Sequence, residues 1–127
     1  MLAAEYGATI VDVSSDEELC WYAVRCVFAT GWPLDRAMPV YEERITLWRA
    51  SSAEEAIERA EAEALVYACS VEESPDTYLG IAQSYRLVEG PGDGAEVFSL
   101  MRNSTLEPDK YLDTFFDTGA ERQKTVE

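Results

Sequence analysis

The chain contains no histidine, and this absence restricts the chemistry open to its 127 residues. Histidine is the commonest general base near neutral pH and the commonest metal ligand, and Ser-His or Cys-His catalytic pairs require it. Lysine is scarce as well, because Lys110 and Lys124 are the only two and both lie near the C-terminus. The sequence therefore favours a protein that is not an enzyme, with no catalytic residue, no metal ligand and no cofactor.

Cysteine pairs and long hydrophobic runs are missing too. Cys20, Cys26 and Cys69 have no C-x-x-C spacing, and the first two would lie about 20 Å apart along one strand, too far to form a disulfide. We expect all three to be reduced core residues. No apolar run is long enough to span a bilayer, and residues 1–18 lack the positive region and apolar stretch of a secretion signal. We expect a cytoplasmic protein.

Basic residues are few: 25 acidic residues face 10 basic ones, which gives a net charge of −15. Segments 1–18, 51–76 and 103–127 hold 19 of the 25 acids, whereas the charges of 19–50 and 77–102 balance. An acidic surface repels nucleic-acid phosphates and anionic lipid headgroups, so we expect neither nucleic acid nor a membrane as a partner. A basic protein would be attracted.

The stretch YEERITLWRASSAEEAIERAEAEA, residues 41–64, changes its periodicity in the middle. Residues 41–48 alternate with a period of two, which predicts a strand. From Ala53 the apolar residues return every three or four positions, which predicts an amphipathic helix that ends near Ser70. Between the two elements, Ser52 and Glu55 match the capping box that begins a helix.

Three further segments complete the predicted fold. Residues 19–30 are rich in aromatic and branched side chains and predict a strand that forms a hairpin with the strand after it. Residues 78–88 and 95–102 predict a second hairpin through the turn EGPGDG. Pro108 and Gly119 mark the start and end of a short C-terminal helix.

The element order β-β-α-β-β-α predicts an α+β fold. Its sheet would have four antiparallel strands from two β-hairpins, with one long helix packed on it and the short C-terminal helix after it. We expect a single domain over 19–119, preceded in 1–18 by an extension with a short strand and an acidic linker. Residues 120–127 would form a loose tail.

One face of each predicted strand is assigned to the core. The predicted core residues are Cys20, Tyr22, Val24, Cys26, Phe28, Tyr41, Ile45, Leu47, Leu79, Ile81, Tyr85, Leu87, Phe98 and Leu100. The opposite face would carry the predicted binding site, a trough with aromatic walls and arginines: Trp21, Arg25, Arg44, Trp48 and Arg86. Trp and Arg are enriched where binding energy concentrates.

Several stretches resemble a known bacterial family. The segments WYAVRCVF, YLGIAQSYRL and AEVFSLMRNSTLEPDKYLDTFFDTGAERQ, together with the stretch over residues 41–64, are similar to the domain of unknown function numbered 4288, over about residues 21–123. The resemblance implies a small bacterial cytoplasmic protein and supplies no activity and no functional residues.

Two classes of function fit these observations. The first is a non-catalytic protein-binding domain that docks a protein on the aromatic face or the acidic rim, for example an immunity or inhibitor protein for a basic partner. The second is a small-molecule-binding protein or enzyme whose arginines hold an anionic ligand. A cover over the aromatic face, by the C-terminal helix or by a second copy in a homodimer, stays open as an explanation of the same residues.

Overall fold

The computed structural model describes residues 18–30, 39–70 and 75–123. The extension predicted over 1–18 therefore lies, except for Glu18, outside the described residues, and the tail is described only as far as Gln123. No helix among the described residues is long and apolar enough to cross a membrane.

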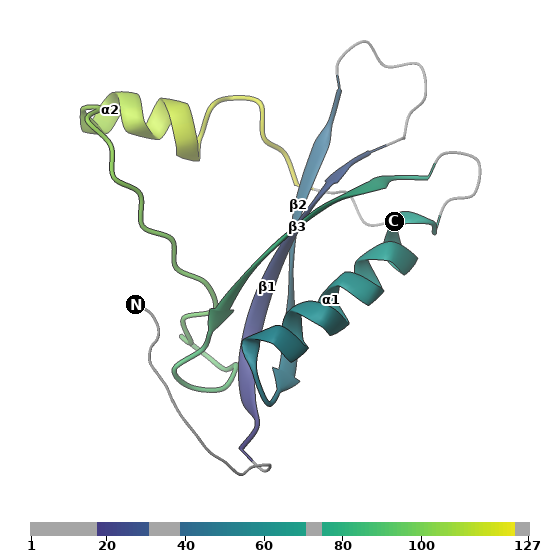
Figure 1. Ribbon diagram of the computed structural model, residues 1–127. Coiled ribbons are helices and arrows are strands. Elements are labelled where there is room, and N and C mark those ends of the chain that lie inside the picture. The colour runs from purple at the N-terminus through teal and green to yellow at the C-terminus, as the bar shows by residue number, and fades with distance from the viewer. Residues whose placement is uncertain (1–17, 31–38, 71–74, 124–127) are drawn as a thin grey trace.

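The described chain forms one antiparallel sheet with a helix across one of its faces (Figure 1). Its elements are β1 (Cys20–Ala29), β2 (Tyr41–Ala50), α1 (Ala53–Ala68), β3 (Thr77–Arg86), α2 (Pro108–Tyr111) and the π-helical turn η3 (Leu112–Phe116). The strand order is β2-β1-β3, so β1 is central. The predicted α+β class is correct, while the four-stranded sheet is wrong because the described residues contain three strands.

Helix α1 begins where the sequence places it, since the hydroxyl of Ser52 accepts a hydrogen bond of 3.1 Å from the backbone N–H of Glu55. In a capping box the Glu side chain usually accepts from the backbone N–H of the N-cap residue, which is Ser52. Here it accepts from the preceding residue, Ser51. The Glu55 carboxylate accepts from the backbone N–H of Ser51 at 2.7 Å and from its hydroxyl at 2.6 Å. These bonds lower the pKa of Glu55 and fix the turn between β2 and α1.

The core lies between α1 and the sheet. The helix contributes a stripe of buried alanines, Ala56, Ala60, Ala64 and Ala68. Opposite them lie Tyr22, Val24, Cys26 and Phe28 of β1, of which Val24 and Phe28 are fully buried. The small methyl groups allow the helix backbone to lie close to the central strand, and the large side chains of β1 fill the space between them.

The predicted strand over 95–102 does not form, because the chain after the turn pairs with no strand of the sheet and contacts it through a side chain. Leu87 still donates to the Trp21 carbonyl at 2.9 Å, and a turn follows in which Gly94 has a φ of 80°. Phe98 then packs on Tyr85, with ring centroids 5.9 Å apart. The β3 edge is also irregular, since Gly80 with a φ of 81° lies where the register with β1 shifts.

The predicted core is correct for β1 but wrong for most of the residues assigned to it from β2 and β3. Tyr22 of β1 lies opposite Trp48 of β2, and Val24 lies opposite Thr46, so these pairs share the face that α1 covers. The residues of β2 that the sequence assigned to the core therefore lie on the other face. The predicted core residues that are exposed are Tyr41, Ile45, Leu47, Leu79, Ile81 and Leu100. A strand has a period of two, so one residue of register exchanges every side chain between its faces.

Candidate functional site: the open face and the C-terminal arm

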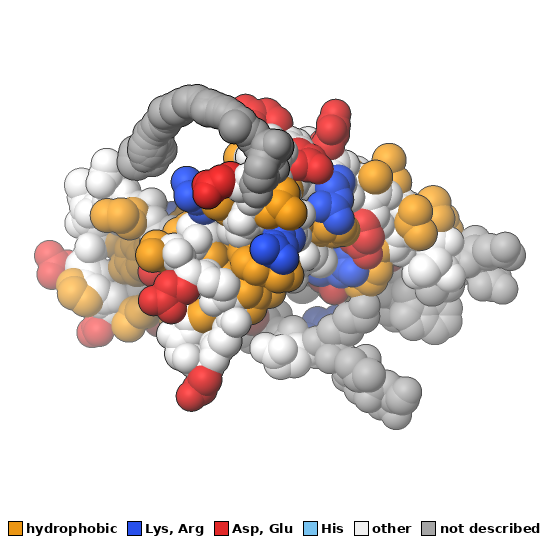
Figure 2. All heavy atoms as spheres, turned by 90° about the horizontal axis from the view of Figure 1, so that it is seen from below, with side chains coloured by type: hydrophobic (Ala, Val, Ile, Leu, Met, Phe, Trp, Pro, Cys, Tyr) orange, Lys and Arg blue, Asp and Glu red, His pale blue; other side chains and the backbone are white. Residues whose placement is uncertain are grey.

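The face of the sheet away from α1 presents large hydrophobic side chains to solvent, and we call these residues the open face. They are Tyr41, Ile45, Leu47, Leu79 and Ile81, with exposed fractions of 62%, 45%, 39%, 45% and 61%. Figure 2, which views the molecule from below, shows hydrophobic side chains at the surface among charged groups of both signs. A single exposed leucine is ordinary, whereas several on one sheet face mark an interaction site.

Arg25 is the charged centre of this side of the sheet. Its Nε donates to Gln83 Oε1 at 3.1 Å, a second bond runs from its Nη2 to the same oxygen, and Glu43 lies 3.6 Å away. Phe98 covers the guanidinium, with the ring centroid 5.2 Å from Cζ. These contacts hold the Arg25 side chain in place and engage its hydrogen-bond donors.

The structure does not bring the five predicted site residues onto one face. Trp21 and Arg25 lie on the side of the open face. Gly90 packs against Trp21, because a Cβ at Gly90 would lie 3.5 Å from the indole ring. Arg44 and Trp48 lie under α1, and Arg86 pairs with Tyr22 on that same side. The aromatic walls of the predicted trough therefore belong to opposite sides of the sheet.

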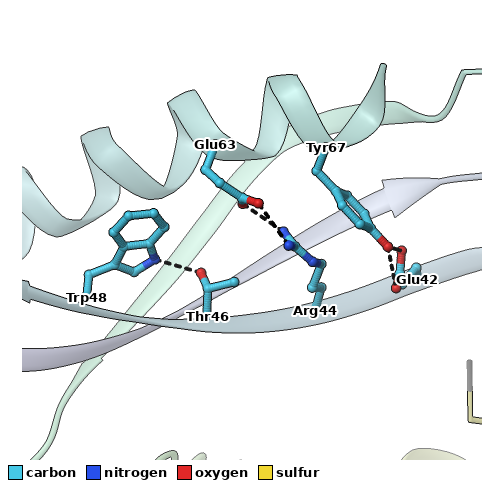
Figure 3. Close-up of polar contacts among 6 residues, drawn as sticks. All are labelled: Glu42, Arg44, Thr46, Trp48, Glu63 and Tyr67. Carbon is cyan, nitrogen blue, oxygen red and sulfur yellow. Dashed lines mark hydrogen bonds and ion pairs between the residues drawn. The ribbon is translucent and has the colours of Figure 1, made fainter. Parts of the chain in front are cut away.

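The side chains of β2 that face α1 form a polar seam with the helix, shown in Figure 3. Arg44 donates to both oxygens of Glu63 at 2.8 and 2.9 Å, and its Cζ lies 3.7 Å from the ring centroid of Tyr67. Tyr67 donates in turn to the Glu42 carboxylate at 2.8 and 3.0 Å. The paired geometry is the one that guanidinium and carboxylate prefer, and it joins β2 to α1.

A second polar contact in the seam fixes Trp48. Its indole N–H donates to the Thr46 hydroxyl at 2.6 Å, and Arg59 of α1 lies over the ring with Cζ 5.2 Å from the centroid. Arg59 also donates to the Arg49 carbonyl at 2.8 Å. Trp48 is thus part of the packing between helix and strand.

The ion pair between Arg44 and Glu63 shifts both groups toward their charged forms. The hydrogen bonds from Arg44 lower the pKa of Glu63, and Glu63 raises the pKa of Arg44. A carboxyl group whose pKa is lowered by folding stabilises the fold above its unfolded pKa. This stabilisation is lost as the pH falls through the folded pKa.

We expect Glu63→Gln to lower the free energy of unfolding by about 1 kcal/mol near pH 7, because the charge-assisted bonds become neutral ones. The difference between the two proteins should begin to shrink as the pH falls below about 4.5, where the carboxylate of the unfolded chain takes up a proton, and it should be lost as the pH falls through the lower pKa of the folded protein. Urea unfolding at about pH 7 and about pH 3 measures both values. An equal difference at the two pH values would show that the charge of Glu63 contributes nothing.

The buried titratable groups serve the packing. Burial raises the pKa of the Cys26 thiol, so little of it is thiolate at neutral pH. Burial and a hydrogen bond to Glu61 raise the pKa of Tyr78, which keeps its hydroxyl protonated as a donor. All three cysteines are free, but the prediction that all belong to the core is wrong for Cys69, which is exposed. Among the described residues no three acidic or cysteine side chains gather in a way that could hold a metal ion.

The C-terminal arm, residues 95–119, is the second unpartnered feature. Among the described helices and strands, α2 and η3 contact only each other. The arm has internal packing, because Arg102 donates to the Tyr111 hydroxyl at 2.9 Å and lies 4.1 Å from the ring centroid of Phe115. Its exposed hydrophobic residues are Val97, Leu100, Met101, Leu106, Leu112, Phe115 and Phe116.

Sequence reasoning missed the open face because it counted those residues as core. A signal was present, since β2 carries hydrophobic side chains at both parities: Ile45 and Leu47 on one side and Trp48 on the other. A strand with apolar residues on both faces is expected to be covered on both. Only one of its faces is covered by α1.

The described residues define a class, a small α+β protein with a three-stranded sheet whose face away from α1 exposes large hydrophobic side chains. Comparisons with protein-family models, curated proteins and solved structures return no match for this chain. The resemblance to the bacterial family of unknown function accordingly stays a prediction.

Proposed function

We propose that this protein is a cytoplasmic, non-catalytic protein-binding domain that docks a protein on its open face. The observation that carries the proposal is the group of five large hydrophobic side chains exposed together on one side of the sheet. The free cysteines fit a reducing compartment, and the missing histidine argues against catalysis.

The charge supports a finer version, an inhibitor-like or immunity-like protein for a basic partner. Glu54 and Glu58 are exposed on the outer side of α1, and the whole chain carries a net charge of −15. An acidic surface accelerates the capture of a basic protein and disfavours nucleic acid and anionic membranes as partners. Such capture weakens as salt screens the charges.

The alternative of an anionic small-molecule ligand has less support. Arg44 is engaged by Glu63 beneath the helix, and Arg25 is engaged by Gln83 and Glu43 and covered by Phe98. An anion would have to displace these partners. We therefore keep protein binding as the proposal.

The proposal is tested by capture from the native cell lysate at low salt with the tagged chain, followed by a salt gradient. We expect a stoichiometric protein, and we expect its recovery to fall at least tenfold with Ile45→Glu. Leu65→Glu is the matched control, since Leu65 is exposed on α1 and lies away from the open face. Elution of a basic protein early in the gradient would support the inhibitor version.

The result that would overturn the proposal is recovery that is the same for the wild type and both variants. Circular dichroism of Ile45→Glu should match the wild type, because this side chain is already half exposed. A collapsed spectrum would instead show that Ile45 belongs to the core.

A further inference from the structure

The open face and the C-terminal arm both expose large hydrophobic side chains. Among the described helices and strands none lies over the open face, and α2 and η3 expose hydrophobic side chains while they contact only each other. Helix α2 and turn η3 together have nine residues, and an isolated helix shorter than about 12 residues is marginal in water. Tyr111 and Phe115 pack on each other, whereas Phe116 is 75% exposed, so packing against another surface would stabilise this end of the arm.

The arm leaves the sheet that it belongs to. Phe98 is its last aromatic contact with that sheet, through Tyr85 and Arg25. Between Phe98 and Pro108 the chain forms neither helix nor strand, and at about 3.3 Å per residue this segment spans at most about 33 Å. Figure 1 shows α2 standing away from the sheet at the end of this segment. The arm can therefore reach the sheet of a neighbouring molecule.

The charges of the two surfaces permit a contact between them. The side of the sheet that holds the open face carries Arg25 and Arg49, with Glu43 opposite Val27 and Glu96 against Tyr85. The end of the arm is acidic: Glu107, Asp109, Asp113 and Asp117 against Lys110. Arg49 is exposed on this side of the sheet and can pair with a carboxylate of the arm, although the whole chain is strongly negative.

From these observations we infer that the open face is covered by the C-terminal arm of a second copy of this chain, and that the two copies exchange arms reciprocally. Each copy offers one face and one arm, so the exchange closes with two-fold symmetry and leaves neither feature uncovered. This inference rests on the proposed function and names its partner. Two other occupants of the open face compete with this one: a basic protein, and the chain's own arm folded back onto its own sheet.

The first experiment is light scattering of the full chain after size exclusion. We expect twice the chain mass of 14.2 kDa, and we expect the dimer to strengthen as salt rises, because screening reduces the repulsion between two chains of charge −15. Ile45→Glu on the face and Phe116→Asp on the arm should each raise the dimer dissociation constant at least tenfold. Leu65→Glu should leave it unchanged.

The decisive experiment mixes the two disrupted variants. Ile45→Glu retains an intact arm, and Phe116→Asp retains an intact face, so one of the two contacts is restored in a mixed pair. We expect heterodimers in the mixture at concentrations where each variant alone is monomeric. An arm folded onto its own sheet would give no such rescue.

Two failures are distinguishable. A monomeric wild type, or a dimer that neither variant weakens, overturns the exchange of arms. If the wild type is monomeric while lysate capture still depends on Ile45, the open face binds a different protein and the proposed function stands. If neither self-association nor capture depends on the open face, the proposed function fails as well.

Discussion

Phe28→Ala is expected to lower the free energy of unfolding by about 3 to 5 kcal/mol, the largest effect of any single truncation we predict. Phe28 is fully buried at the end of β1 and packs between Tyr67 of α1 and Tyr78 of β3, with centroid distances of 5.2 and 5.5 Å. Its removal leaves a cavity where all three elements meet. Urea or thermal unfolding measures the loss.

Phe28→Leu serves as the control for this substitution. It retains most of the volume but removes the edge-to-face contact with Tyr67, which should cost a smaller amount, about 1 to 2 kcal/mol. A loss below about 1 kcal/mol for Phe28→Ala would mean that helix and sheet are not packed through this ring. Such a result would contradict the packing of Phe28 against Tyr67 and Tyr78.

Ala60→Leu is expected to destabilise the fold by about 1 to 3 kcal/mol, because the larger side chain would separate α1 from the sheet. Ala60 is the middle of the alanine stripe and is 1% exposed. The substitution itself favours neither helix nor coil by much, since alanine and leucine both have high helix propensity. The cost therefore measures the close approach of the two layers.

Ala62→Leu is the matched control on the same helix. Ala62 is exposed two residues further along, so the larger side chain points into solvent and the stability should change by less than about 0.5 kcal/mol. Chemical denaturation of both variants gives the comparison. Equal effects at the two positions would contradict the orientation of α1.

The two layers differ in how far the sequence reveals their contacts. In α1, the spacing of alanines and glutamates identifies the buried stripe, because a helix has a single apolar side that must face the sheet. In β2, hydrophobic residues occur at both parities, and the pairing of Tyr22 with Trp48 decides which parity is buried. That pairing depends on how the chain returns from β1, which local sequence does not specify.

Local sequence by itself determined the positions of β1, β2, β3 and α1, the Ser52 cap and the acidic character of the surface, because each depends on periodicity, a side chain near the backbone or composition. Only the tertiary structure decided which side chains of β2 are covered, that residues 95–102 do not extend the sheet, and that the arm stands apart. The reason is that register and edge pairing are set by contacts between residues distant in sequence. The alternation within one strand shows which side chains share a face, but it does not show which of the two faces is buried.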